Sequence, residues 1–143
     1  MNNQEVIELL NHSMLKEHSE NAVYKKLSGY LTAYPGMDKL ISNFAEMELK
    51  HAHILSLGII QLGGTPSKVE PPAPDSAQAQ PDKEKLIGII RQQLINEEEA
   101  VANYRRYAAM ITVGGLKEQI NQIIAEESLH AAVLLKLLNQ VRG

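Results

Sequence analysis

The chain has 143 residues, of which 44% are hydrophobic, 22% charged and 4% aromatic, and it contains no cysteine. This length suits one domain, and a formal net charge of −3 gives no basic excess of the kind that nucleic-acid binding needs. The missing cysteines exclude disulfides, thiolate zinc sites, iron–sulfur clusters and thiol nucleophiles. No apolar run approaches the ~18 residues of a membrane span, and the N-terminus lacks the basic region of a secretory signal, so we expect a cytoplasmic protein.

Glycine and proline divide the chain into four segments of helical composition. In chain order, the expected helices are Gln4–Ala33, Met37–Leu62, Lys83–Ile111 and Leu116–Val141. Two short breaks, Tyr34-Pro35-Gly36 and Gly114-Gly115, predict tight turns, because such residues end helices. Between the second and third helices, residues 63–82 hold five of the six prolines and predict an extended linker.

The two halves of the chain repeat one another. Glu48 and Glu127 lie 79 residues apart, as do His51 and His130. The repeat is much longer than a solenoid period, so we interpret it as a duplicated helical hairpin.

Two such hairpins predict an all-α four-helix bundle that forms a single domain over residues 1–143. Residues 4–62 and 83–141 form the hairpins, and each is antiparallel because its turn is short. The linker of about 20 residues can span ~60 Å, whereas a helix of 26 residues is ~39 Å long. It can therefore cross the whole bundle and make the second and third helices parallel, although a loop joining adjacent ends also fits.

Ionisable residues interrupt the apolar stripe of each helix at the middle level of the predicted bundle. They are Glu17, Glu48, His51, Glu97, Glu127 and His130. A Glu and a His three residues apart project from one helix face, so that both can bind one ion.

Four carboxylates cannot stay ionised in a core without compensation, because each costs several kcal/mol to desolvate. No Lys or Arg lies on these stripes at that level. Two divalent cations cancel four negative charges, and a set of carboxylate and imidazole ligands suits iron, manganese or zinc.

The ordered motifs EHSENAVY (17–24), ELKH (48–51), EEEAVANY (97–104) and ESLH (127–130) resemble those of the ferritin-like di-iron carboxylate superfamily, nearest its bacterioferritin and rubrerythrin branches. The resemblance covers all four helices. It implies a ferritin-like bundle and two Fe ions, with Mn or Zn as alternatives. It also implies the ligand sets: Glu17 and His51 for one ion, Glu97 and His130 for the other, and Glu48 and Glu127 as bridges.

Two tyrosines recur at equivalent places beside this set. Tyr24 and Tyr104 each lie seven residues beyond the Glu of their own helix, ~10 Å along the axis and out of its reach. We expect each to contact the Glu of the facing helix, Tyr24 with Glu97 and Tyr104 with Glu17, and so to tune the site. The alternative is that both are plain core aromatics.

The sequence also departs from its relatives. Leu49 stands where bacterioferritins carry a haem-ligand Met, and Met47 is expected to point elsewhere, so haem is not expected. Without cysteine there is no rubredoxin module, and electrons must come from an external donor. The extra rubrerythrin carboxylate is replaced by Ala100, while Glu20 takes the pseudo-equivalent place on the first helix as a possible further ligand. The sequence supplies no fifth helix after Gly143, which favours a homodimer over a larger cage.

Three functions follow from these patterns. The first is a non-haem di-iron oxidoreductase, an enzyme of ferroxidase or peroxide-reductase type that reacts Fe(II) with O2 or peroxide. The second is an iron-storage subunit of a hollow cage. The third is a structural or interaction bundle without turnover, either metal-free or zinc-filled.

Other polar and aromatic residues are interpreted more simply. The expected surface or solvated residues are His12, His18, His53, Glu98, Glu99 and Glu126, and the expected packing or dimer-surface residues are Tyr30, Tyr34 and Tyr107. The alternative for the six stripe residues is that they too form surface pairs and solvated helix charge.

Overall fold

A computed structural model describes residues 3–71 and 79–143, and these residues form four α-helices and no strand. The helices are α1 (Asn3–Gly29), α2 (Met37–Gln61), α3 (Lys83–Met110) and α4 (Gly114–Arg142). They confirm the predicted all-α four-helix bundle. Across the described part of the chain, no helix is both long enough and apolar enough to span a membrane.

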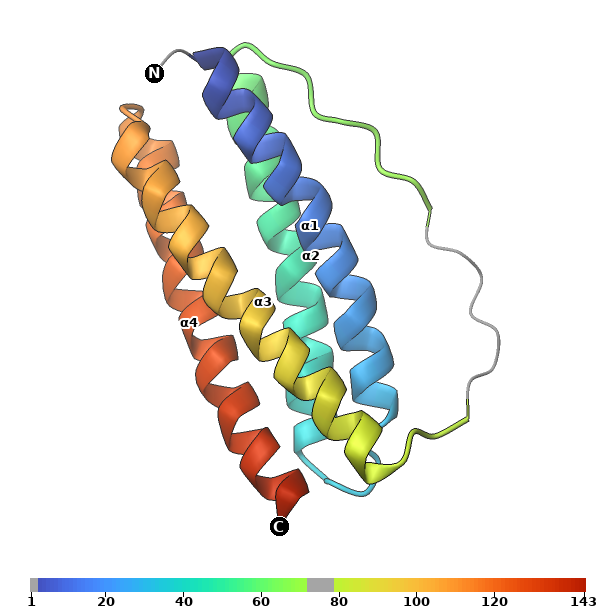
Figure 1. Cartoon of the computed structure of the whole chain (residues 1–143). Coiled ribbons are helices and arrows are strands. Elements are labelled where there is room, and N and C mark those ends of the chain that lie inside the picture. Colours follow the sequence, from blue (N-terminus) through green and yellow to red (C-terminus); the bar gives the residue numbers. More distant parts are fainter. Residues whose placement is uncertain (1–2, 72–78) are drawn as a thin grey trace.

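The bundle consists of two antiparallel hairpins (Figure 1), in which α1 packs mainly on α2 and α3 mainly on α4. α2 ends at the opposite end of the bundle from the start of α3, so these two helices run parallel. The described parts of the crossover are fixed to both ends of α1. The Asn11 side chain bonds the carbonyl of Thr65 and the N–H of Ser67, and the Gln80 side chain bonds the carbonyl of Tyr30. This confirms the predicted long crossover.

Helix ends differ from the prediction by a few residues. α1 ends at Gly29, not at Ala33, because the N–H of Tyr30 shares its bond between the carbonyls three and four residues earlier, at 3.0 and 3.2 Å. Such bonds tighten the chain into a final turn that the α-helix does not continue. α4 begins at Gly114 instead of Leu116, so the break precedes the glycine pair.

The residues that precede α2 and α3 start these helices in different ways. Gly36 precedes α2 with φ 94°, a left-handed conformation that glycine adopts without steric cost. Asp82 precedes α3, and its carboxylate accepts a 2.8 Å hydrogen bond from the N–H of Lys85.

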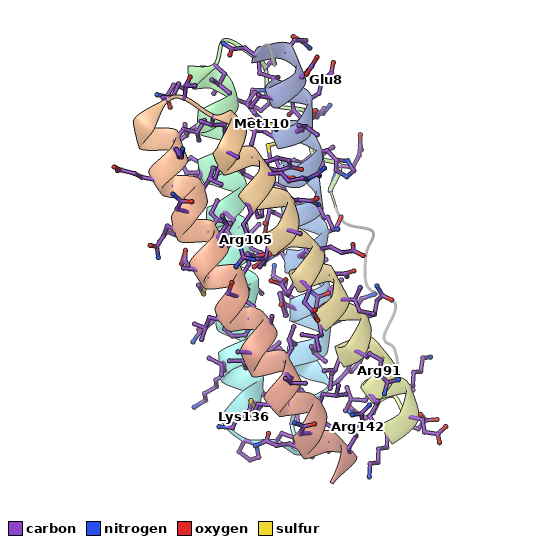
Figure 2. The ribbon with its side chains drawn as sticks, turned by 60° about the vertical axis from the view of Figure 1, so that its left-hand side comes forward. Glu8, Arg91, Arg105, Met110, Lys136 and Arg142 are labelled. Atoms are coloured by element: carbon purple, nitrogen blue, oxygen red, sulfur yellow. The ribbon has the colours of Figure 1, made fainter. Side chains whose placement is uncertain are left out.

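The apolar core is divided into two clusters. The N-terminal cluster lies where α1 and α4 begin and α2 and α3 end, and includes Leu10, Leu55, Ile59, Leu116 and Ile120. The C-terminal cluster lies at the other end and includes Leu27, Ile41, Ile90, Leu134 and Leu137. Charged side chains such as Arg91 and Lys136 lie on the outside (Figure 2). The middle of the bundle, between these clusters, is occupied by buried ionisable residues.

Candidate metal centre

All six predicted ligands are buried in the middle of the bundle. Glu17 is on α1, Glu48 and His51 on α2, Glu97 on α3, and Glu127 and His130 on α4, and none of them is more than 3% exposed. The alternative of surface pairs and solvated helix charge is therefore wrong. The duplicated hairpin brings all four helices to one polar level.

The six side chains form two overlapping groups of potential ligands. One group is Glu17, Glu48, His51 and Glu127, and the other is Glu48, Glu97, Glu127 and His130. Within each group, one ligand atom of every residue lies within 4.8 Å of the others. Glu48 and Glu127 belong to both groups, which is the arrangement expected of bridging carboxylates.

The imidazole of His51 directs its Nδ1 atom into the first group. This atom lies 3.1 Å from a carboxylate oxygen of Glu127 and 3.7 Å from oxygens of Glu17 and Glu48. One nitrogen thus faces three acids from three different helices.

His130 repeats this arrangement in the second group. Its Nδ1 atom lies 3.0 Å from an oxygen of Glu48, 3.3 Å from Glu127 and 3.5 Å from Glu97. The two imidazoles are 6.2 Å apart between ring centroids, with their planes inclined by 26°. The sequence repeat is therefore a local two-fold repeat of the site.

Most of these buried atoms are not hydrogen-bonded. Among the described residues, eight buried side-chain atoms lack a hydrogen-bond partner, and seven of them belong to the six predicted ligands. Both Nδ1 atoms are included, so the short contacts to carboxylates do not have hydrogen-bond orientation. Buried polar groups are normally satisfied, and an orphaned set that converges on one volume fits coordination of a cation.

The acids raise the proton affinity of both histidines. Burial lowers the pKa of His51, but the close carboxylates of Glu127 and Glu17 outweigh it and raise the pKa to about 10. For His130, burial is likewise outweighed by Glu127 and Glu97, which raise the pKa to about 9. Each imidazole is thus protonated at neutral pH unless a metal ion displaces the proton.

The carboxyl groups divide between protonated and ionised forms. Burial raises the pKa of Glu97 to about 8 and that of Glu48 well above its ordinary value, and neighbouring acids add to both shifts. Burial also acts to raise the pKa of Glu127, but His130 and His51 outweigh it and hold this pKa below its ordinary value. In the metal-free centre, protons therefore neutralise the carboxylate charge that metal ions would neutralise when bound.

The predicted tyrosine contacts form on one side only. The hydroxyl of Tyr104 donates a 2.6 Å hydrogen bond to Oε1 of Glu17, as expected. Tyr24 finds no hydrogen-bond partner among the described residues, so the expected bond to Glu97 is absent. Gln93 contacts Glu97 instead, at 3.4 Å.

Glu20 lies beside the centre but outside both ligand groups. Its carboxylate accepts a hydrogen bond from the Gln93 side chain. Burial raises the pKa of Glu20 to about 7, and the charge of Glu17 adds to this effect. Its role as a further ligand stays a prediction.

Two residues that touch the histidines escaped the sequence reasoning. Glu126 was expected on a solvated face, but it is only partly exposed and its Oε1 lies 3.3 Å from Nε2 of His51. Met47 was considered only as a haem ligand, and the contact of its Sδ with Nε2 of His130, at 3.4 Å, was not predicted. The repeat was the available signal, because Met47 and Glu126 are also 79 residues apart.

A pocket between α1 and α3 leads to the centre. Its lining includes Lys16 and Asn103 toward the outside and Glu17, Tyr104 and Glu127 toward the inside. Glu17 and Glu127, which belong to the first ligand group, thus lie at the wall of this pocket.

The chain resembles solved bundles of this kind. It matches a Desulfovibrio desulfuricans bacterioferritin with a TM-score of 0.77 and 20% identity, over 98% of this chain and 81% of that one. A Rhodobacter capsulatus bacterioferritin matches with a TM-score of 0.72 and 21% identity, over 96% and 85%. A ferritin-like diiron-carboxylate protein from Bacillus anthracis matches with a TM-score of 0.67 and 26% identity, over 95% and 96%.

The chain has the fold of the ferritin-like di-iron carboxylate superfamily. No family model and no curated protein matches its sequence. The Desulfovibrio bacterioferritin is described with a diiron site in different catalytic states. The Rhodobacter protein is described with a metal-free dinuclear site and haem iron, so the absence of haem here stays a prediction.

Proposed function

We propose that this ferritin-like chain is a non-haem di-iron oxidoreductase. In this proposal Glu17 and His51 would hold one iron ion, Glu97 and His130 would hold the other, and the carboxylates of Glu48 and Glu127 would be shared by both. The oxidant is O2 or peroxide.

One observation carries the proposal: the buried, orphaned atoms belong to two ligand groups that share two carboxylates. The donor chemistry also fits, since imidazole nitrogen and carboxylate oxygen suit iron or manganese better than soft metals. The solved relatives of this fold include bacterioferritins with a described diiron or dinuclear site.

When bound, a pair of iron ions supplies two electrons together, so that two Fe(II) and two protons reduce one O2 to hydrogen peroxide, or one peroxide to two waters. The chain's own residues prepare the site for this chemistry. Tyr104 orients Glu17 through its 2.6 Å hydrogen bond, which leaves Oε2 of that carboxylate free to bind. Glu48 is fully buried, so its carboxylate is shielded from bulk solvent.

The pocket beside α1 gives the oxidant its route in this proposal. Glu20 also lines the pocket, and its raised pKa of about 7 lets it hold or release a proton at neutral pH. Since the reduction consumes protons, we propose that Glu20 acts as a proton donor and not as an additional metal ligand.

The partners implied are metal ions, O2 or peroxide and an external electron donor, with no nucleic acid or membrane. We further propose a cytoplasmic homodimer. Size exclusion separates this assembly from a storage cage, because a dimer of the 15.9 kDa chain elutes near 32 kDa and a twenty-four-subunit shell near 380 kDa.

Anaerobic loading with Fe(II), followed by air, tests the function. We expect two Fe per chain by elemental analysis, a ferric absorption band after exposure to air, and one O2 or peroxide consumed for every two Fe(II). Loading of two ions without oxidation indicates a structural bundle. Fewer than two ions per chain and no ferric band contradict the proposal.

A further inference from the structure

The two halves of the centre differ at the outer face of each histidine. Met47 directly precedes the bridging Glu48 on α2, and Glu126 directly precedes the bridging Glu127 on α4. Each reaches across the bundle to the histidine of the opposite hairpin. The repeat thus places a thioether at one Nε2 atom where it places a carboxylate at the other.

On the His51 side, the acceptor is a carboxylate. Oε1 of Glu126 lies 3.3 Å from Nε2, and the acid is only 16% exposed. A carboxylate at the outer nitrogen of a histidine keeps the proton on that nitrogen, leaves the inner nitrogen free to bind a metal ion, and makes it a stronger ligand.

On the His130 side, the acceptor is a thioether, which accepts hydrogen bonds weakly. Sδ of Met47 lies 3.4 Å from Nε2. The ring is held mainly by packing, because it stacks on Phe44 with 3.9 Å between centroids and meets the edge of Tyr24 at 5.8 Å. In the second hairpin the residue equivalent to Phe44 is Ile123, so His51 lacks this aromatic contact.

Glu17 and Glu97, the carboxylates that each belong to one ligand group only, differ in the same direction. Glu17, beside His51, receives the 2.6 Å hydrogen bond of Tyr104. Glu97, beside His130, receives only the 3.4 Å contact of Gln93, and the equivalent Tyr24 makes no hydrogen bond to it. Both terminal ligands of the first subsite are therefore oriented by polar partners, and neither terminal ligand of the second is held as firmly.

We infer that the two metal subsites are unequal: the subsite of Glu17 and His51 binds first and more tightly, with Glu126 as its positioning residue, while Met47 leaves the subsite of Glu97 and His130 weaker. The inference rests on the proposed two-metal function. Loss of such an outer partner commonly costs 10- to 100-fold in metal affinity, and we expect a difference of about this size between the subsites. The weaker subsite would exchange its ion faster.

Anaerobic titration of the full chain with Co(II) tests this inference, because this ion has a visible spectrum and does not need to react. We expect two binding steps that differ about 10- to 100-fold in dissociation constant. In a parallel titration with diamagnetic Zn(II), the side-chain NMR signals of His51 are expected to shift during the first step, and those of His130 during the second.

Variants at the two equivalent positions assign the steps. Glu126→Gln is expected to weaken the first step about tenfold or more and to spare the second. Met47→Glu supplies the missing carboxylate and is expected to tighten the second step toward the first. Glu118→Gln removes an exposed acid of the same helix and serves as the matched control, with both steps unchanged.

The outcomes separate the inference from the function on which it rests. Two equal steps, a first step at His130, or a Glu126→Gln variant that binds like the Glu118→Gln control overturns the inference but leaves a two-metal centre. Failure of the unmodified chain to bind two Co(II) or two Fe(II) ions overturns the proposed function itself. A melting curve of each metal-free variant shows whether it folds, and the unmodified chain decides the order of filling without any variant.

Discussion

The ends of the bundle and its middle are built for opposite purposes. Each end is an apolar cluster in which residues such as Leu55 and Leu134 are fully buried, whereas the middle buries four carboxyl groups and two imidazoles. Apolar burial stabilises a fold at roughly 25 cal/mol per Å², while burying ionisable groups costs free energy unless they are paired. The ends therefore hold the middle in a geometry that its own residues do not favour, as is common at functional sites.

The largest expected effect on stability comes from truncating a side chain in one of the apolar clusters. Leu134→Ala is expected to lower the free energy of unfolding by about 2–5 kcal/mol, because it leaves a cavity in the C-terminal cluster. Urea unfolding measures the loss, and Leu55→Ala repeats the test at the other end. Elemental analysis should still find two ions per folded chain, and a loss of metal without a loss of stability would contradict the division of roles.

Metal binding to the buried carboxylates and imidazoles should increase the free energy of unfolding. At 100 times the dissociation constant, each bound ion adds about 2.7 kcal/mol to the free energy of unfolding. Glu48→Gln is expected to abolish most of this gain by removing a bridge, and to leave the metal-free protein at least as stable. Thermal melting with and without Zn(II) measures both effects.

Glu46→Gln is the matched control for that bridge variant, because Glu46 is an exposed acid of the same helix. Its stabilisation by Zn(II) should equal that of the unmodified chain. Equal stabilisation of the Glu48→Gln variant would argue against a bridging role.

Bound metal should remove the loss of stability that the metal-free protein shows as the pH rises. The pKa values of His51 and His130, raised to about 10 and about 9, mean that the folded protein binds protons that the unfolded chain releases near pH 6.5. Their contribution is complete below that pH and is lost as the pH rises through 9 and 10. Metal ions compete with the same protons, so metal affinity should instead rise, about tenfold per pH unit for each proton displaced.

Calorimetry in buffers of different ionisation enthalpy counts the protons released when metal binds. We expect the release of more than one proton per chain at neutral pH. We also expect the melting temperature of the metal-free protein to fall as the pH rises. Metal binding without proton release would contradict protonated histidines in the metal-free centre.

The smallest expected effect distinguishes the two tyrosines. Tyr104→Phe should lower the free energy of unfolding by about 1 kcal/mol and weaken metal binding, because it removes the hydrogen bond to Glu17. Tyr24→Phe removes a hydroxyl that has no partner in the described chain, so its effect should be a few tenths of a kcal/mol at most. Equal effects of the two changes would contradict the observed asymmetry.

The sequence predicted the bundle and the burial of its six central residues, because helical periodicity and the repeat constrain both. Helix ends were less predictable, since the end of α1 at Gly29 depends on how the N–H of Tyr30 is shared. The facing helices correctly predicted the bond of Tyr104 to Glu17, whereas the same argument wrongly predicted a bond of Tyr24 to Glu97.

The asymmetry lies in side chains that a repeat argument treats as equivalent. Gln93 is long enough to reach Glu97. Its counterpart Ser13 is short and donates a hydrogen bond to Tyr107 instead. Glu17 therefore remains available to accept the hydrogen bond of Tyr104. Only the packed structure reveals such competition between neighbours.

Equilibrium dialysis of the full chain against Fe(II) without oxygen, followed by elemental analysis, tests the central claim most directly. The ligand groups of Glu17 with His51 and of Glu97 with His130, joined by two shared carboxylates, predict two iron ions per chain. One ion or none per chain would contradict the two-metal centre.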